Sequence, residues 1–429
     1  MMREWTNTPV GEAFEIDPAR PLSKGSTTAF LPMDAIAADE RQPTRIETRQ
    51  YSGSGAKFQN GDTLIARITP CLENGKTCFV AGLNDGEVGH GSTEYIVLTG
   101  RPSRTDNLFA YYLARSDRFR QYAIGQMEGT SGRQRVPSKA IAKYTIELPP
   151  LPEQRAIAHV LGSLDDKIEL NRRANQTLEA MAQAVFKDWF VDFAPVLAKS
   201  EKREPYLANE LWDALPNRID GGVPLGWTRG PVGDWVTFNP TEALRKGVVA
   251  QYLDMAALPT EGATADQPVP RAYGSGMKFR NGDTLMARIT PCLENGKTAF
   301  VHSLPDDAVA WGSTEFIVMR PIAPVPRPYG YLLARDAAFR DHAIRSMTGT
   351  SGRQRAQVQA IASFPVCLPT DESVWKAFAA VVDPLFAGIR ANAEESRTLA
   401  DLRDVLLPKL MSGDIRIKDA ERFVEEATT

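Results

Sequence analysis

Basic and amide side chains stand at matching positions in the two halves of this sequence, most of them beside Gly-containing turns. The guanidinium of Arg and the amide of Gln can each form two parallel hydrogen bonds to a guanine or an adenine edge, and the ammonium of Lys neutralises phosphate. This set predicts contact with DNA rather than catalysis. The candidate DNA-binding residues are Lys57, Arg67, Lys76, Arg133, Gln134, Arg135, Lys278, Arg288, Lys297, Arg353, Gln354 and Arg355.

Catalytic groups do not occur in a recognisable arrangement. Gly75-Lys76-Thr77 resembles the end of a phosphate-binding loop, but Pro70 stands where that loop requires its first glycine. None of the four histidines occupies the same position in both halves, which argues against a shared Ser-His-Asp site. The four cysteines include no Cys-x-x-Cys pair, so we expect neither a metal site nor a disulfide framework.

These residues lie in a tandem duplication. Residues 53–80 and 274–301 are identical at 24 of 28 positions, at an offset of 221 residues. The sequence Gly-Thr-Ser-Gly-Arg-Gln-Arg also occurs twice, at 129–135 and 349–355. A repeat of this length indicates a pair of domains and not a solenoid.

Short strands joined by turns are expected in the early part of each domain. The run 63–68 follows an Asn-Gly-Asp turn, and 95–98 is a second strand-like run. Residues 107–127 have a helical pattern, with plausible core positions that include Tyr112 and Phe119.

The composition is that of a folded globular protein, with 429 residues, 43% of them hydrophobic and 24% charged. No apolar run approaches the ~20 residues that cross a membrane, and the N-terminus lacks a signal-peptide core, so we expect a cytoplasmic protein without a membrane partner. The net charge of −3 does not favour nucleic-acid binding by itself. Residues 101–135 and 320–355, however, each hold more Arg and Lys than Asp and Glu.

A long helix is predicted after each domain. Core positions recur at alternating steps of four and three residues from Ile157 to Trp189, and again from Phe378 to Leu410, which is typical of a coiled-coil seam. A helix from Pro152 to about Phe190 would measure about 58 Å at ~1.5 Å per residue. The open alternative is that each helix packs only on its own domain.

The two seams match when the helices are laid antiparallel, with Ile157 opposite Leu410. Polar residues then meet at the midpoint, where they would fix the register at a cost in stability. Arg403 falls opposite Leu164, and we expect its charged end to extend outward. This pairing relates the two domains by an approximate two-fold axis. The register residues are Asn171, Asn175, Asn392 and Ser396.

Four motifs flank these helices: Leu-Pro-Pro-Leu-Pro-Glu-Gln-Arg-Ala-Ile-Ala at 148–158, Lys-Asp-Trp-Phe-Val-Asp-Phe at 187–193, Pro-Leu-Gly-Trp at 224–227 and Leu-Leu-Pro-Lys-Leu-Met-Ser-Gly-Asp-Ile at 406–415. With the order of domains and helices, they resemble the specificity subunits of type I restriction-modification systems. The resemblance covers essentially the whole chain.

The expected fold class is α+β, with two similar domains of mixed β structure and helices, separated by two long helices that form an antiparallel coiled coil. The resemblance implies that the domains are target-recognition domains. The expected boundaries are 1–150 for the first target-recognition domain, 151–192 for the first spacer helix, 193–223 for a linker, 224–370 for the second target-recognition domain, 371–411 for the second spacer helix and 412–429 for a C-terminal tail.

The same resemblance implies a non-catalytic subunit that reads a bipartite site in double-stranded DNA. Two modification subunits would dock on its helices, carry S-adenosylmethionine and methylate adenine. ATP-dependent restriction subunits are a further implied partner, and no cofactor is expected in this chain. Because the domains share long identical runs, we expect related half-sites and a partly palindromic interrupted target.

Three other functions stay open at this point. The chain could be a self-contained methyltransferase or nuclease with an unfamiliar site. It could be a non-catalytic scaffold whose domains bind protein partners, which salt-sensitive binding to duplex DNA would exclude. It could also recognise DNA for another defence complex.

Overall fold

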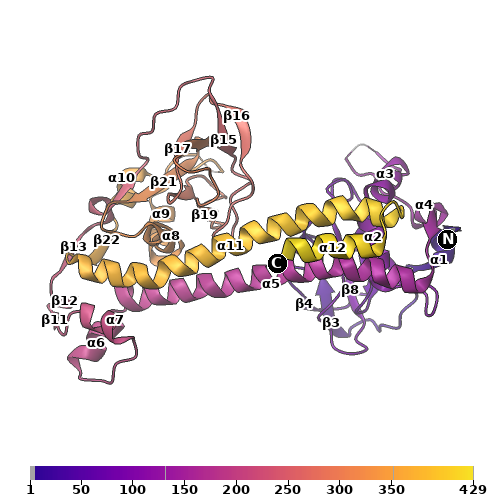
Figure 1. The fold of residues 1–429 in the computed structure, drawn as a ribbon, viewed down its shortest axis with the longest axis horizontal. Helices are drawn as coiled ribbons and strands as arrows, with labels where there is room; N and C mark the ends of the chain where they lie inside the picture. The colour runs from indigo at the N-terminus through magenta and orange to yellow at the C-terminus, as the bar shows by residue number, and fades with distance from the viewer. Residues whose placement is uncertain (1–4, 131, 351, 429) are drawn as a thin grey trace. The chain divides into compact units, whose positions relative to one another are not determined.

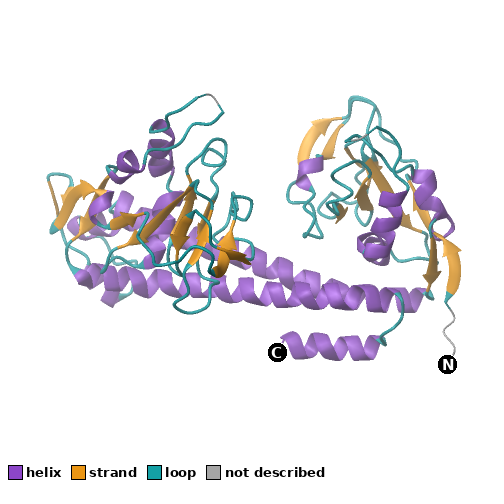
Figure 2. Ribbon diagram, turned by 90° about the horizontal axis from the view of Figure 1, so that it is seen from above, coloured by secondary structure: helices purple, strands orange, loops and turns teal. Residues whose placement is uncertain are grey.

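The computed structural model describes residues 5–130, 132–350 and 352–428, and the chain divides into two compact units (Figure 1). The first unit joins Met1–Leu170 to Glu395–Thr429, and the second is Asn171–Glu394. Each unit contains one repeated domain and a stretch of both long helices. Small sheets and helices occur in both units (Figure 2), which confirms the α+β class.

Three sheets form the first domain. β1 (Thr6–Pro9) pairs with β10 (Thr145–Leu148) and joins the two ends of the domain. The core sheet has the antiparallel order β2-β9-β6-β7, with β2 (Phe14–Ile16), β9 (Tyr95–Gly100), β6 (Thr63–Ala66) and β7 (Thr77–Phe79). The edge sheet has the order β4-β3-β8-β5, with β4 (Glu47–Gln50), β3 (Thr27–Leu31), β8 (Gly89–Gly91) and β5 (Lys57–Phe58).

The second domain repeats this topology sheet by sheet. β13 (Trp227–Pro231) pairs with β22 (Pro365–Pro369). Its core sheet has the order β14-β21-β18-β19, with β14 (Val236–Phe238), β21 (Phe316–Pro321), β18 (Thr284–Ala287) and β19 (Thr298–Phe300). Its edge sheet has the order β16-β15-β20-β17, with β16 (Val269–Ala272), β15 (Val249–Leu253), β20 (Ala310–Gly312) and β17 (Met277–Phe279).

Short helices complete each domain. They are α1 (Val10–Ala13), η1 (Met33–Ala35), α2 (Asn107–Arg115), α3 (Asp117–Gly125) and α4 (Ser138–Lys143) in the first, and η3 (Val232–Asp234), α8 (Arg327–Arg335), α9 (Ala337–Arg345) and α10 (Val358–Ala362) in the second.

The segment 107–127 is helical as predicted, but Ser116 interrupts it. This residue has extended backbone angles, ends α2 and accepts a hydrogen bond from the Phe119 amide at 3.4 Å to cap α3. Tyr112 and Phe119 are buried in the core of the first unit.

The long helices are α5 (Leu151–Phe186), which continues into the π-helical turn η2 (Lys187–Val191), and α11 (Glu372–Met411). In the second unit their rings and amides meet in antiparallel order. The Trp189 and Phe378 ring centroids lie 5.9 Å apart, and Asn392 Nδ2 donates to Asn175 Oδ1 at 2.9 Å. These contacts confirm the predicted antiparallel register within this unit.

The expected outward orientation of Arg403 is wrong. Its side chain is buried in the first unit, and its Nη1 lies 2.7 Å from Oδ1 of Asp165. Asp165 also accepts a hydrogen bond of 2.6 Å from the Tyr112 hydroxyl. A buried acid thus lies beside the seam position Leu164, so the guanidinium has a partner inside the unit.

The presumed linker and tail both contain helices. The linker holds α6 (Ala194–Ser200) and α7 (Asn209–Ala214), and its end forms a two-stranded hairpin of β11 (Ile219–Asp220) and β12 (Val223–Pro224) that crosses the expected boundary at 223. The tail holds α12 (Ile417–Thr428), on which Ala420 is buried in the core of the first unit. Among the described residues, no helix combines the length and the apolar character that crossing a membrane requires.

Candidate nucleic-acid interface

Three distant segments meet at one end of the core sheet in each domain. In the first domain, the amide of Arg67 donates to Glu94 O at 2.9 Å, the amide of Thr69 donates to Gln134 O at 3.0 Å, and the amide of Val136 donates to Arg67 O at 2.9 Å. In the second domain the matching bonds are Arg288 to Glu315 at 2.9 Å, Thr290 to Gln354 at 3.1 Å and Ala356 to Arg288 at 2.8 Å. The duplicated sequence therefore builds the same platform twice.

A glycine-dependent hairpin projects from this platform. The main chains of Glu128 and Arg135 pair through bonds of 2.9 and 2.8 Å, and the loop between them contains Gly129 and Gly132 at φ of 121° and 79°. Residues with a Cβ rarely adopt such angles, so the two glycines set the shape of the loop. The second copy has Gly349 at 131° and Gly352 at 77°. Ser131 and Ser351 lie outside the described residues.

The two arginines of each hairpin have different environments. Arg133 and Arg353 are exposed, and their guanidinium groups have no hydrogen-bond or ion-pair partner among the described residues. Arg135 instead contacts Glu94 at 2.7 Å, and Arg355 contacts Glu315 at 2.6 Å. The hydrogen bond with its acid raises the pKa of each of these two arginines, so both stay charged. Arg133 and Arg353 are therefore the hairpin groups most available to a ligand.

Two further candidate residues in each domain lie half-buried beside the hairpin. They are Arg67 and Gln134 in the first domain, and Arg288 and Gln354 in the second. The amide of Gln134 donates to Oγ1 of Thr69 at 2.9 Å, and the amide of Gln354 donates to Oγ1 of Thr290 at 3.0 Å. Nε of Arg67 and Nε of Arg288 are buried, and neither has a hydrogen-bond partner in the part of the chain that the structure describes. The structure thus brings Arg67, Gln134 and Arg135 together in one domain and their counterparts together in the other.

The four candidate lysines bind main-chain oxygens of their own domains. Lys57 Nζ donates to Arg20 O at 2.9 Å, and Lys278 Nζ donates to Glu242 O at 2.7 Å. Lys76 Nζ donates to Met33 O at 3.1 Å, and Lys297 Nζ donates to Met255 O at 2.8 Å. These contacts anchor the segments that the lysines bind. A lysine that also contacted a DNA phosphate would have to bind the phosphate and its main-chain oxygen with the same ammonium group.

Sequence reasoning missed another pair of arginines, on the edge sheets. Arg49 Cζ lies 4.1 Å from the centroid of the Phe30 ring, and Arg271 Cζ lies 4.6 Å from that of Tyr252. The signal was present, because Arg-x-Tyr occurs at 49–51 and 271–273, each time close before a Gly-Ser-Gly. Both arginines are exposed.

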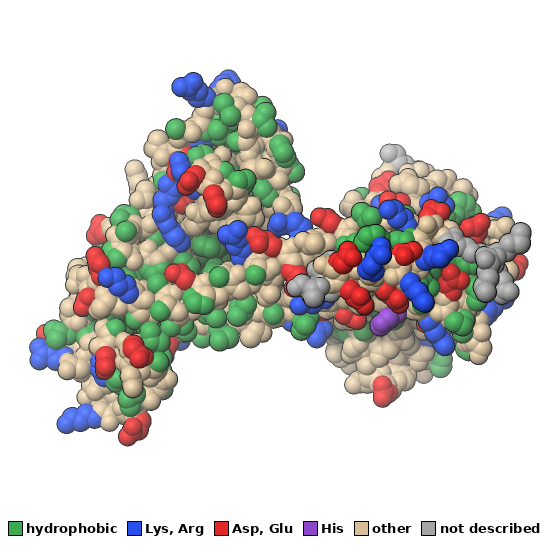
Figure 3. All heavy atoms as spheres, viewed as in Figure 1, with side chains coloured by type: hydrophobic (Ala, Val, Ile, Leu, Met, Phe, Trp, Pro, Cys, Tyr) green, Lys and Arg blue, Asp and Glu red, His purple; other side chains and the backbone are tan. Residues whose placement is uncertain are grey.

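Charges of both signs lie intermingled on the face of the first unit that Figure 3 shows. On this face, positive charge is therefore local and does not form one broad basic surface. Among the described residues, no group of three or more His, Cys, Asp or Glu side chains is arranged to hold a metal ion.

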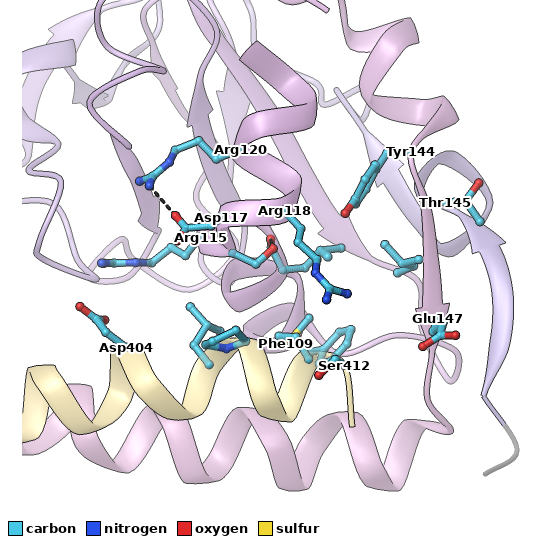
Figure 4. Close-up of a pocket in the computed structure, with 16 residues that line it drawn as sticks. Phe109, Arg115, Asp117, Arg118, Arg120, Tyr144, Thr145, Glu147, Asp404 and Ser412 are labelled. Carbon is cyan, nitrogen blue, oxygen red and sulfur yellow. Dashed lines mark hydrogen bonds and ion pairs between the residues drawn. The ribbon is translucent and has the colours of Figure 1, made fainter. Parts of the chain in front are cut away.

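Each unit also has a pocket where β10 or β22 lies near the long helices. The pocket of the first unit, of about 440 Å³, is lined by charged groups that include Arg118, Glu147 and the ion pair Arg120–Asp117 (Figure 4). In the pocket of the second unit, of about 340 Å³, Ala338 and Cys367 take the places of Arg118 and Glu147. The two pockets share no set of reactive groups, so they do not form a duplicated catalytic site.

Comparison with known proteins gives consistent relatives. Residues 2–180 match the family described as "Type I restriction modification DNA specificity domain". The chain is 35% identical over 410 residues to the type I restriction enzyme HindI specificity subunit of Haemophilus influenzae, with 83% of this chain and 87% of that protein covered. It is 24% identical over 332 residues to the MjaIX specificity subunit of Methanocaldococcus jannaschii, with 72% and 69% covered.

A solved structure has a similar fold. The type I restriction-modification S subunit from M. genitalium matches with a TM-score of 0.51 at 15% identity, over 95% of this chain and 96% of that one. At this identity the match supports the architecture only.

Proposed function

The chain belongs to the family of type I restriction-modification specificity subunits, and on that premise we propose that it reads a bipartite DNA site, one half with each repeated domain. The target-recognition domains are 1–150 and 224–370. The observation that carries this proposal is the duplicated hairpin, which presents Arg133 in one domain and Arg353 in the other. An exposed guanidinium on a hairpin suits a phosphate or a guanine edge.

The long helices are the proposed docking elements for two modification subunits. Large apolar side chains remain more than half exposed on them, namely Leu170 at 59%, Met181 at 51% and Val405 at 52%. Apolar groups left exposed on a helix are suited to cover by another protein. The modification subunits supply S-adenosylmethionine and methylate adenine, and ATP-dependent restriction subunits join the same complex. The chain itself supplies no catalytic residue and no cofactor, and it acts in the cytoplasm.

The two half-sites are related in sequence. The loops 129–135 and 349–355 are identical in sequence, and Arg67 and Glu94 have identical counterparts in Arg288 and Glu315, so the contacts that these residues make with DNA are the same. Because the predicted domain arrangement is two-fold symmetric, equal contacts favour an inverted, partly palindromic target.

Sequencing of modified adenines in host DNA tests this function, with the gene intact and deleted. We expect methylation at one interrupted motif to disappear upon deletion and to return with a plasmid copy. An expressed gene whose deletion leaves every methylated motif unchanged would contradict the proposal. Two unrelated half-sites would contradict the palindrome alone.

A further inference from the structure

The two edge sheets have the same strand order and register, but they expose different side chains. In the first domain Phe30 lies opposite Glu47 and Thr28 opposite Arg49. In the second domain Tyr252 lies opposite Val269 and Ala250 opposite Arg271. This common register makes Arg49 and Arg271 structural equivalents, and it makes Val269 the counterpart of Glu47.

An aromatic cluster supports each of these arginines. His90 lies beside Phe30, with ring centroids 5.0 Å apart, and Trp311 lies beside Tyr252, with ring centroids 4.4 Å apart. Arg271 Cζ is 5.7 Å from the Trp311 ring centroid, and the indole Nε1 of Trp311 donates to Arg271 O at 3.3 Å. Arg271 thus lies against two aromatic rings, which restricts its guanidinium while leaving it exposed.

In the first domain the equivalent guanidinium is already bound. Arg49 Nη2 lies 2.6 Å from Oε2 of Glu47, and Arg49 Nε donates to the same oxygen at 2.8 Å. Glu47 also contacts Arg45 at 3.2 Å, and Arg45 contacts Asp34 at 2.7 Å. Four charges therefore satisfy one another across the exposed edge of this domain.

The second domain has no acid at the corresponding position. Val269 replaces Glu47, and Ala256 replaces Asp34. The Arg271 guanidinium has no ion pair within the described ranges, and Val269, which faces the same side of the sheet two residues before it, is 54% exposed. Free guanidinium donors suit O6 and N7 of guanine, and an apolar neighbour suits the methyl group of thymine.

We infer that Arg271 reads a base edge in the half-site of the second domain, and that Glu47 withholds Arg49 from the same role in the first domain. The inference rests on the proposed function. The shared hairpins make the two half-sites alike, and the edge sheets would make them differ. In the first domain Glu47 and Asp34 neutralise Arg49 and Arg45, whereas the second domain has Val269 and Ala256 at the positions of these two acids.

The test uses the complete complex with R271A and with V269E, and it determines the methylated motif at each base position. R271A removes the donors, and V269E is expected to bind them as Glu47 binds Arg49. R271A should relax one specified base pair of one half-site by roughly 5- to 150-fold in relative methylation, because a bidentate contact discriminates by ~1–3 kcal/mol. V269E should relax the same base pair to a smaller extent, because an exposed ion pair is weak. R218A removes an exposed charge from the linker and should leave the motif unchanged.

E47V provides the opposite test, since it frees Arg49 and should change the base preference of the other half-site only. If R271A, V269E and E47V all methylate the same motif as the wild type, the inference is overturned and the proposed function is left intact. Absence of any motif that depends on the wild-type gene would instead count against the proposed function. Equal weakening of methylation at all sequences by R271A would show a phosphate contact and would also overturn base reading.

Discussion

At the residue scale, the exposed hairpin arginines are the most direct test of DNA contact. We expect R133A and R353A each to weaken binding of the complex to its target by about fivefold or more. Loss of a phosphate contact would lower the slope of log K against log salt by ~0.9 for each variant, whereas loss of a base contact would relax one base pair. Titration of labelled duplex at several salt concentrations measures both effects.

The control is R416A, which removes an exposed Arg near the C-terminus and should bind as the wild type does. If R133A and R353A also bind as the wild type does, the hairpin is excluded from the interface.

A second residue-scale prediction concerns pH and uses the difference between the copies. His90 is buried between Phe30 and Tyr51, and burial lowers its pKa below the ordinary value of 6.5. The unfolded chain then binds more protons than the folded chain between the two pKa values, so the free energy of unfolding falls as the pH drops through 6.5. H90W introduces the residue that the second domain has at this position, Trp311, and should remove this component.

Urea unfolding of wild type and H90W at pH 5.5 and 7.5 measures this difference. Stability should fall less on acidification in H90W than in wild type. An equal loss in both proteins would show that His90 is not responsible.

The candidate lysines show which contacts the sequence could not predict. The sequence places Lys57 and Lys76 beside turns, and the structure agrees. It does not indicate that they bind Arg20 O and Met33 O, which lie 37 and 43 residues away in segments whose sequences differ between the copies. Arg133 was easier to anticipate, because its exposure follows from glycines that are adjacent in sequence.

At the element scale, the helix pair was the most predictable part of the fold. The spacing of seam residues alone placed Trp189 against Phe378 and Asn175 against Asn392. The seam pattern failed at Arg403, because its partner Asp165 is not a seam residue and was left out of the pairing. A heptad pattern ranks positions by hydrophobicity, so it cannot identify a buried ion pair beside them.

That ion pair gives the element-scale prediction. R403A leaves Asp165 buried without its cation and should lower the free energy of unfolding by ~3–5 kcal/mol. In the second unit the equivalent positions hold Phe386, Ala182 and Leu332 in place of Asp165, Arg403 and Tyr112. The triple variant Y112L/D165F/R403A copies that apolar layer and should recover most of the loss. Denaturant melts of the three proteins decide the matter, and a triple variant less stable than R403A would show that the polar network is not replaceable.

At the scale of the whole molecule, each compact unit is built from both halves of the chain. The first unit takes Glu395–Thr429 from the second half, and the second unit takes the C-terminal part of α5 from the first. We therefore expect fragments 1–204 and 205–429, cut in the exposed segment between α6 and α7, to assemble when they are coexpressed.

The buried pair predicts which partner each fragment prefers. An antiparallel pair of two first fragments would place Ala182 where Arg403 belongs, and Asp165 would be buried without a cation. A pair of two second fragments would leave Arg403 without Asp165. Only the mixed pair satisfies both charges, and an unpaired buried charge costs several kcal/mol. Native mass spectrometry of the mixture should show a one-to-one complex over either homodimer, and R403A in the second fragment should reduce that preference. Equal amounts of all three dimers would show that the charges do not direct the assembly of the two halves.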